Sequence, residues 1–304
     1  MEEEVVESSK RVMGIKPLRV AITGGKGGTG KSTIACSLAL SLAEKFKVLL
    51  VDADVECPDD HIILSVKREK IKEVTIPVPS FDHTRCLMCG KCSEACREHA
   101  IVHVHGHYPI FIEDRCNGCG ACILTCPNNA IGTSEKVIGS VYEGFLNEKY
   151  PKRLRENFTL ISGEAEVNLA STAAIVDATI KNSHDVDIII IDTAAGVHCN
   201  VIHALIKSHI AFAITEPTPL GVHDLKLILK LLKKLGIDSN IVLNRAGIGD
   251  DNIIYNVSKE SGIPVAAEIP YSETILRAYS KGKPFKIQGI TDIMKVVESL
   301  MVLT

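Results

Sequence analysis

The residues best suited to chemistry begin with a short glycine-rich stretch, GGKGGTGKST, at residues 24–33. Its spacing fits the pattern G-x-x-x-x-G-K-S/T through four residues: Gly25, Gly30, Lys31 and Ser32. In that pattern backbone N–H groups surround phosphate oxygens, the lysine adds a positive charge, and the hydroxyl reaches a magnesium ion. The stretch therefore predicts a phosphate site made by Gly25, Lys26, Gly27, Gly28, Thr29, Gly30, Lys31, Ser32 and Thr33.

Such a loop must be positioned by a strand before it and a helix after it. The apolar, β-rich run LRVAIT at residues 18–23 predicts the strand. Apolar side chains at helical spacing follow the loop, at Ile34, Ala35, Leu38 and Leu42. A glycine-rich run alone is more often an ordinary turn, but the complete pattern at a strand-to-helix junction favours phosphate binding.

Carboxylates that could hold magnesium end two further predicted strands. KVLLVDAD, at residues 47–54, indicates a buried parallel strand that ends in Asp52 and Asp54. DIIIIDTAAG, at residues 187–196, indicates another that ends in Asp192. Acids that merely end a strand at the solvent are the alternative. With a phosphate loop in the same chain, we predict that Ser32, Asp52 and Asp192 hold magnesium, the aspartates through water.

Eight of the eleven cysteines lie between Cys86 and Cys126, where they define a second kind of site. They form two runs, each spaced C-x-x-C-x-x-C-x-x-x-C, which is the bacterial ferredoxin spacing for [4Fe–4S] clusters. Three closely spaced thiolates bind one cluster, while the fourth cysteine begins a helix and ligates the other. Zinc is the alternative metal. We assign the first cluster to Cys86, Cys89, Cys92 and Cys126, and the second to Cys116, Cys119, Cys122 and Cys96.

The two cysteine runs are related by an internal duplication. CLMCGKCSEACREHAI matches CNGCGACILTCPNNAI, although Arg97 stands where a proline often follows the fourth cysteine. The segment from Pro77 to about Lys136 resembles a two-cluster ferredoxin. Between the halves, three histidines at alternate positions predict one solvated face of a small hairpin, with metal binding as the alternative: His103, His105 and His107.

Lys26 refines the prediction for the glycine loop. The form K-G-G-x-G-K-S resembles the deviant Walker A motif of the MinD/ParA/Mrp ATPases and the nitrogenase iron protein. The resemblance implies that ATP binds between two copies of the chain and that Lys26 reaches the partner's nucleotide. It also implies catalytic roles for Lys26, Lys31, Asp54 and Asp192, with Asp54 near the attacking water. Adenine contacts are implied for Asn244 and for the loop around Pro270.

The resemblance to the nitrogenase iron protein weakens at Cys199. That cysteine lies at the offset of a switch-region cluster ligand, but the matching stretch for a second ligand, SGEAEVNLAST, has no cysteine. A third, shared cluster is therefore not expected. The incidental thiols Cys36 and Cys57 are expected to have no ligand role.

The remaining sequence alternates strand and helix patterns, which predicts an α/β P-loop fold: a mainly parallel sheet covered by helices on both faces. The ATPase domain is predicted at residues 1–77 and 139–304, and a small α+β ferredoxin domain is inserted at residues 78–138. Residues 1–17 are expected to form a tail or short helix. GSVYEGFLNEKYPKRLREN, at residues 139–157, is interpreted as a polar return segment, followed by a helix over 165–181.

The composition of the 304-residue chain limits the classes of partner and location that we expect. Apolar residues make up 46%, and the net charge of −3 gives no electrostatic reason to expect a nucleic-acid partner. No run approaches the roughly 18 apolar residues of a membrane span, and the acidic start MEEEVVESSK does not resemble a secretory signal. We expect a cytoplasmic protein of an anaerobic or low-oxygen cell, without membrane contact.

The combined motifs predict an ATP-hydrolysing iron–sulfur protein that forms a homodimer. Its cofactors would be ATP or ADP, Mg²⁺ and two [4Fe–4S] clusters. It would couple nucleotide-dependent dimerisation to redox assistance of metallocofactor or iron–sulfur cluster assembly in an unknown client protein. The alternative is an ATP-gated electron donor like the nitrogenase iron protein, and a MinD/ParA-like positioning role is a third, weaker possibility.

Overall fold

A long mixed β-sheet forms the centre of the computed structural model, which describes residues 17–167, 169–181, 185–279 and 287–302. The strands of this sheet are β1 (Leu18–Thr23), β2 (Val48–Asp52), β3 (Arg68–Phe81), β6 (Ile131–Gly144), β7 (Phe158–Ala165), β8 (Ile188–Asp192), β9 (Ile210–Thr215), β10 (Asp238–Ala246) and β11 (Val265–Pro270). They lie in the order β11-β10-β9-β1-β8-β2-β7-β6-β3. Neighbours from β11 to β7 pair in parallel, whereas β6 and β3 are antiparallel.

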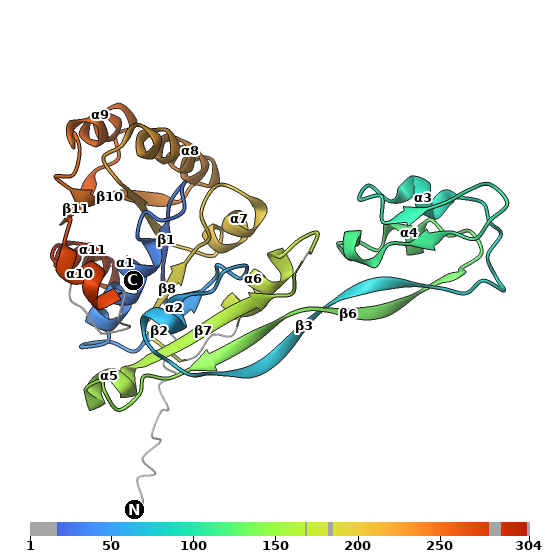
Figure 1. The fold of residues 1–304 in the computed structure, drawn as a ribbon, viewed down its shortest axis with the longest axis horizontal. Coiled ribbons are helices and arrows are strands. Elements are labelled where there is room, and N and C mark those ends of the chain that lie inside the picture. Colours follow the sequence, from blue (N-terminus) through green and yellow to red (C-terminus); the bar gives the residue numbers. More distant parts are fainter. Residues whose placement is uncertain (1–16, 168, 182–184, 280–286, 303–304) are drawn as a thin grey trace, which may run out of the picture.

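Helices cover both faces of the parallel part (Figure 1). Alternation along β1 explains this, because Val20 and Ile22 pack with one set of helices while Ala21 packs with the other. The first face carries α1 (Lys31–Leu42) and α11 (Ile290–Met301). The second carries α6 (Ala173–Lys181), α7 (Cys199–Leu205), α8 (Pro219–Leu235) and α9 (Asn252–Ser261). The other helices of the body are α2 (Asp60–Ile63), α5 (Lys152–Asn157) and α10 (Glu273–Tyr279). The predicted mainly parallel α/β architecture is confirmed.

Strands β3 and β6 leave the body as a two-stranded arm (Figure 1). Their pairing runs from Arg68 opposite Gly144 to Phe81 opposite Ile131. β7 supports β6 only over residues 139–144, so the arm beyond that point has no third strand. A register shift lies at this junction: Val74 pairs with Gly139, and the next residue, Thr75, pairs with Val137. The arm therefore begins at a β-bulge.

The far end of the arm carries a small cysteine-rich insert (Figure 1). It contains α3 (Lys91–Ala95), β4 (Ile101–Val102), β5 (Ile110–Phe111), a 3₁₀ turn (Glu113–Arg115) and α4 (Ala121–Leu124). β4 and β5 form their own antiparallel pair. A minimal core of Ile101, Cys122 and Ile131 holds the insert together.

Three expectations for local structure were wrong. The expected polar return at residues 139–157 is strand up to Gly144 and helix in α5. The helix expected over 165–181 begins only at Ala173, because Ala165 still belongs to β7 and pairs with Gly139. The small hairpin expected around the histidines at 103–107 is present as β4 and β5, but the single strand face is wrong, since β4 ends at Val102 and a turn through Gly106 follows.

The predicted domain boundaries fall inside secondary structure. Residues 77 and 78 lie within β3, and residues 138 and 139 lie within β6. Pro77 and Pro79 do not interrupt β3, because it is the outermost strand, where a residue without an N–H can be accommodated. The expectation for residues 1–16 lies outside the described residues.

Candidate functional site

The glycine loop joins β1 to α1 at the carboxyl edge of the sheet. Gly28 and Gly30 have φ of 78° and 93°, a region where other residues are strained. Gly25 lies against the backbone of Asp224 in α8, and a Cβ there would be 2.4 Å from the Asp224 carbonyl oxygen. Its place in the chain therefore requires glycine. Lys31 is buried, with its Nζ 3.4 Å from the carbonyl oxygen of Lys26.

A hollow of about 1420 Å³ opens over this loop. Gly30, Lys31, Ser32 and Thr33 line one side. Asn244, Pro270 and Tyr271 line another, so both residues expected near adenine lie at the same hollow. The Asn244 amide donates a 2.7 Å hydrogen bond to the carbonyl of Thr29. Its role toward adenine stays a prediction.

Three carboxylates meet below the loop, within the interior. Asp52 ends β2, Asp192 ends β8 and Asp60 begins α2; each contributes an oxygen to a group within 4.8 Å of one another. All three are fully buried. Asp60 was missed at the level of sequence, where it is one of several acids in DADVECPDD and nothing in the pattern says which turns inward. Asp54 is only partly buried and faces Lys31.

The loop between β2 and α2 fixes the orientation of Asp52. The backbone N–H of Asp54 donates to Asp52 Oδ1 and that of Asp60 to Oδ2, both at 3.2 Å. On the other side of Asp60, the Cys36 thiol lies 3.1 Å from Oδ1. Oδ2 of Asp60 is buried and has no hydrogen-bond partner among the described residues.

Burial dominates the electrostatics of this cluster. It raises the pKa of Asp52 and Asp60 well above their usual range, and the neighbouring carboxylates add to the effect. Burial also raises the pKa of Asp192 to about 7, against the opposing influence of Ser32 and Lys31. Carboxylates that are so close and so buried favour either protons or a divalent cation, which prefers oxygen ligands. The residues present fit the predicted magnesium site.

Lys26 has a partner within its own chain. Its Nζ lies 3.0 Å from Oε1 of Glu216, which follows β9. The other carboxylate oxygen of Glu216 accepts from Arg245 Nη1 at 2.8 Å. Glu216 is almost completely buried, whereas both cations are partly exposed. Glu216 and Arg245 were not singled out from the sequence.

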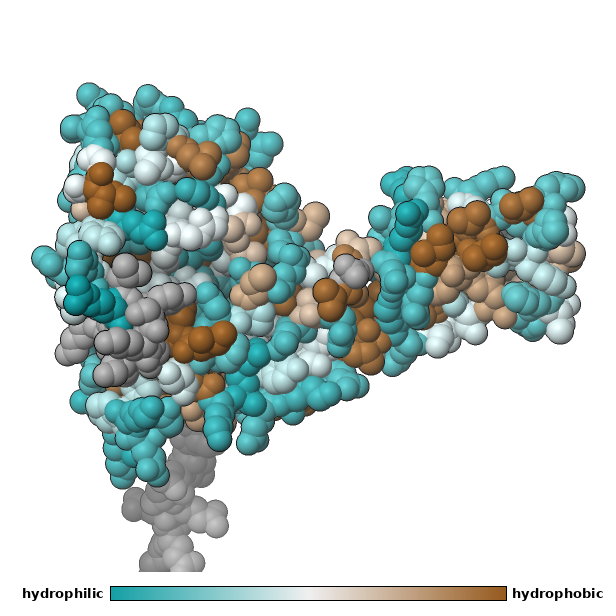
Figure 2. Space-filling view, viewed as in Figure 1, coloured by the Kyte–Doolittle hydropathy of each residue, from teal (hydrophilic) through white to brown (hydrophobic). Residues whose placement is uncertain are grey.

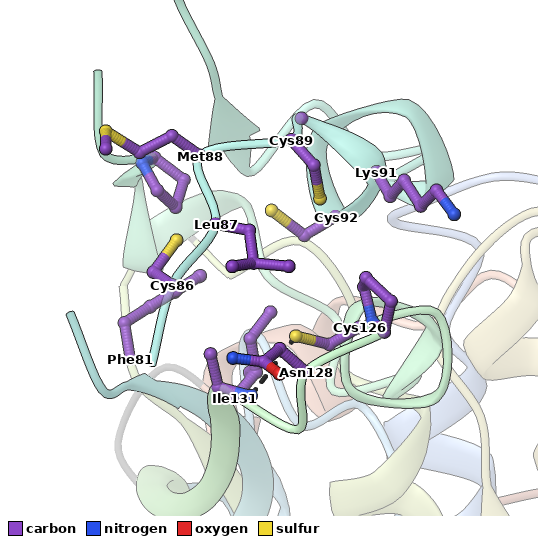
Figure 3. Close-up of a pocket in the computed structure, with 14 residues that line it drawn as sticks. Phe81, Cys86, Leu87, Met88, Cys89, Lys91, Cys92, Cys126, Asn128 and Ile131 are labelled. Atoms are coloured by element: carbon purple, nitrogen blue, oxygen red, sulfur yellow. Dashed lines mark hydrogen bonds between the residues drawn. The ribbon is translucent and has the colours of Figure 1, made fainter. Parts of the chain in front are cut away.

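The first cysteine hollow lies where β3 ends at Phe81 and β6 begins at Ile131, and it has a volume of about 380 Å³. Figure 3 shows Cys86, Cys89 and Cys92 on one continuous segment, with Cys126 across the hollow. Apolar side chains including Phe81 and Ile131 complete the lining. The backbone N–H of Ala130 donates to the Cys126 sulfur at 3.2 Å.

The second hollow, of about 390 Å³, lies beside the arm. Pro77 and Pro79 of β3 form part of its wall, and the cysteines that line it are Cys96, Cys116, Cys119 and Cys122. Each hollow thus takes three cysteines from one run and the fourth from the other. The N–H of Ala100 donates to the Cys96 sulfur at 3.3 Å, which repeats the contact at Ala130.

The backbone repeats the duplication seen in the sequence. Positive φ values recur thirty residues apart, at Met88 and Gly118, Gly90 and Gly120, and His99 and Asn129. The turn after the fourth cysteine is also retained, since the N–H of His99 donates to the carbonyl oxygen of Cys96 and the N–H of Asn129 to the carbonyl oxygen of Cys126. The local backbone is therefore the same whether arginine or proline follows that cysteine.

The remaining cysteines lie apart from these hollows. All eleven are free thiols, and Cys57 and Cys199 are exposed. Cys199 begins α7 directly after the loop that follows Asp192. Within the described residues, no helix combines the length and apolar character needed to cross a membrane.

The comparison with protein families matches residues 20–285 to the CobQ/CobB/MinD/ParA nucleotide binding domain. The chain belongs to this family. Its relatives in the CobQ/CobB/MinD/ParA family include the uncharacterized protein MJ0579 of Methanocaldococcus jannaschii, 40% identical over 269 residues that cover 88% of this chain and 90% of the relative. The septum site-determining protein MinD of Thermotoga maritima is 24% identical over 296 residues, covering 92% and 85%.

A solved member of the family has a similar fold. The septum site-determining protein MinD from Pyrococcus horikoshii, complexed with Mg-ADP, covers 88% of this chain and 87% of its own, with a TM-score of 0.54 and 20% identity. At that identity the likeness shows the fold alone. The family match over residues 20–285 confirms the expected MinD/ParA-type nucleotide-binding ATPase family, whereas the iron–sulfur insert stays a prediction.

Proposed function

We propose that the protein hydrolyses ATP, holds two [4Fe–4S] clusters, and couples nucleotide-dependent dimerisation to redox assistance of metallocofactor or iron–sulfur cluster assembly. One observation carries the proposal: a phosphate loop and two four-cysteine hollows occur in one chain, linked by the arm. β3, whose outer part belongs to the arm, begins at Arg68, shortly after α2, whose first residue is the buried Asp60. A movement of the backbone at the nucleotide pocket could therefore be transmitted to the insert through the short segment that joins α2 to β3.

The ATP chemistry rests on charge and position more than on covalent steps. Lys31 would stabilise negative charge that develops on the phosphates. Ser32, Asp52 and Asp192 would hold magnesium, the aspartates through water, and Asp54 would orient the attacking water. The Mg-ADP of the Pyrococcus horikoshii protein supports magnesium-nucleotide as the ligand class.

In the proposed dimer, ATP lies between two copies of the chain. Lys26 of one copy would contact the phosphates bound to the other and so complete the catalytic site. Asn244 and Pro270 would contact adenine, which is supported by their place in the hollow over the loop.

The cysteine hollows fit [4Fe–4S] clusters in number and chemistry. Each has four free thiols, apolar walls, and one backbone N–H aimed at a sulfur. Burial raises the pKa of Cys122 to about 11, so a bound metal is needed to hold it as thiolate. When bound, such clusters exchange single electrons. We propose residues 78–138 as this ferredoxin-like unit and residues 1–77 and 139–304 as the ATPase.

A second candidate function is ATP-gated electron donation to a partner enzyme. The position of the insert at the end of the arm favours it, because a partner could contact both hollows there (Figure 1). The assembly role is preferred because Cys199 has no second cysteine in residues 162–172 with which to build a shared cluster, as the nitrogenase iron protein does.

The crossed grouping of cysteines gives a direct test of the clusters. We would measure iron, acid-labile sulfide and the electron paramagnetic resonance spectrum after anaerobic purification, with the exposed Cys57→Ser as the control for loss of an unrelated thiol. We expect about eight irons in the parent protein, and the same spectroscopic loss in Cys96→Ser as in Cys116→Ser. Cys126→Ser should instead match Cys86→Ser. Zinc in place of iron, or pairing of Cys96 with Cys86, would contradict the proposal.

Nucleotide dependence then separates the two roles. The clusters would be titrated by electron paramagnetic resonance with ADP and with a non-hydrolysable ATP analogue. A potential shift of about 59 mV, or roughly 1.4 kcal/mol for one electron, would favour ATP-gated donation. Unchanged potentials would favour the assembly role, with the insert as a docked source of electrons.

A further inference from the structure

Glu216 is placed as a shared counter-ion for two basic residues. It lies at the end of β9, its side chain is 8% exposed, and each carboxylate oxygen has one cation. Lys26 comes from the glycine loop after β1, whereas Arg245 comes from β10 on the other side of β9. A carboxylate this deeply buried would be unfavourable without these partners. The triad therefore fixes the position of the Lys26 ammonium in its own chain.

The backbone of Arg245 supports a specific role for this arrangement. Its φ is 55°, in the left-handed region that non-glycine residues seldom occupy. From that position the guanidinium reaches both Glu216 and the carbonyl oxygen of Gly28, at 2.8 and 3.0 Å. Arg245 thus ties Glu216 to the glycine loop independently of Lys26.

These contacts conflict with the role proposed for Lys26. A lysine that reaches phosphates on a second copy of the chain has to leave the carboxylate on its own. Lys26 is 35% exposed, so it can move without disturbing the core, whereas Glu216 stays buried. After Lys26 leaves, the ion pair from Arg245 remains to neutralise Glu216.

We propose that Glu216 is a latch, which holds Lys26 within its own protomer until the phosphates of a nucleoside triphosphate on a second copy displace it. The inference rests on the proposed dimer and adds a condition to it. The phosphates on the second copy must attract Lys26 more strongly than Glu216 does, whose charge is shared with Arg245. A triphosphate meets this condition better than a diphosphate because it carries more negative charge. Glu216 is a positioning residue that acts through Lys26. Its ion pair with Arg245 weakens the attraction of Glu216 for Lys26.

The test measures dimer dissociation constants by sedimentation with Mg²⁺ and a non-hydrolysable ATP analogue. Glu216→Gln keeps the shape but removes the charge, and we expect it to tighten the dimer about tenfold for each latch, which corresponds to about 1.4 kcal/mol. Arg245→Gln should weaken the dimer, because Glu216 would then attract Lys26 alone. The matched control is Glu260→Gln, which breaks an exposed ion pair with Lys226 and should leave the constant unchanged.

A double-mutant cycle separates the latch from a general structural effect of Glu216. Lys26→Ala should dimerise poorly, and adding Glu216→Gln to it should change nothing further. Glu216→Asp keeps the charge one methylene shorter and should lie between the parent and Glu216→Gln, which provides a second variant if the first fails to fold. Equal or weaker dimerisation of Glu216→Gln, or an effect that persists without Lys26, would overturn the latch. A parent protein that stays monomeric with the analogue would overturn the proposed dimer as well.

Discussion

At the scale of the residue, the site is dominated by carboxylates that have too little compensating charge. Asp52, Asp60 and Asp192 lie within one small buried group, and the positive charge of Lys31 offsets the effect of burial on Asp192 only in part. Such a group is more stable when a proton or a cation is present than when all members are ionised. The free energy of unfolding of the metal-free protein should therefore depend on pH.

The sign of that dependence follows from Asp192. Its pKa is raised from 3.8 to about 7 in the folded protein, so between these values the folded chain binds more protons than the unfolded chain. The free energy of unfolding should then fall as pH rises through this window, by on the order of 2–4 kcal/mol. Urea unfolding in EDTA would measure it, and Mg²⁺ should restore stability at the upper end.

Two variants make this prediction specific. Asp192→Asn should flatten the pH dependence because the titrating group is lost. Asp292→Asn removes a half-exposed acid of α11 that pairs with Lys295, and it should leave the slope unchanged. Stability that increased with pH in EDTA would refute the assignment of raised pKa values to this cluster.

The limits of prediction from sequence are also clear at this scale. The glycine loop, Asp52 and Asp192 were predictable because strand, loop and terminal acid are adjacent in sequence. Asp60 and Glu216 were not, because each depends on distant segments: Asp60 on β8, and Glu216 on the glycine loop and β10. No local pattern records which of several acids turns inward.

At the scale of the element, the arm depends on its junction with the sheet. Gly139 lies at the bulge and pairs with Val74 of β3 and Ala165 of β7. A Cβ on Gly139 would be 2.5 Å from the Glu164 carbonyl oxygen and 2.7 Å from Ile175 of α6. The backbone of β7 cannot move aside as a flexible side chain would, so this junction accepts only glycine.

Glycine substitutions in β6 should therefore differ sharply in effect. Gly139→Ala should lower the free energy of unfolding by about 1–3 kcal/mol through overpacking. Gly132→Ala, in the same strand, has its nearest neighbour at 3.9 Å and should change stability by no more than about 0.5 kcal/mol. Urea unfolding of both variants would measure the difference, and equal effects would mean that the junction is not tightly packed.

The arm itself could not be predicted, for a physical reason. Pro77 and Pro79 break helices and stand where the sequence pattern changes, which favours a domain boundary there. In β3 they lie opposite Glu135 and Thr133 on the outermost strand, where only one edge is hydrogen bonded. Sequence pattern identifies proline but not whether a strand is internal or at an edge.

At the scale of the whole molecule, the body and the insert have separate cores. The three large clusters around the sheet include no fully buried residue between 75 and 137, and only the partly buried Ile76 of that range packs against one of them. The insert has its own small cluster around Ile101 and Cys122. Figure 2 shows the two parts as separate masses joined by a narrower neck.

Removal of the insert should therefore spare the ATPase body. We would replace residues 75–137 by an Asn-Gly turn that joins Val74 to Ile138 and keeps the pairing of β6 with β7. Nucleotide affinity should stay within about twofold of the parent, because changes at sites that are far apart have nearly independent effects. Iron binding should be lost. Calorimetry with a nucleotide would measure the first result, and a shortened chain that failed to fold would show that the insert supports the body.

The two prolines of the arm have one more consequence, for the behaviour of many copies in solution. A free strand edge is a template on which another chain can add a strand and begin an aggregate. Pro77 and Pro79 have no N–H to offer a further strand, and both line the second cysteine hollow, where Pro79 is buried. A second arm that approaches edge to edge would find no continuous ladder there. The part of β3 beyond the bulge is thus closed to strand addition both by its prolines and by the insert that lies against it, which should keep copies from joining into fibres at high protein concentration.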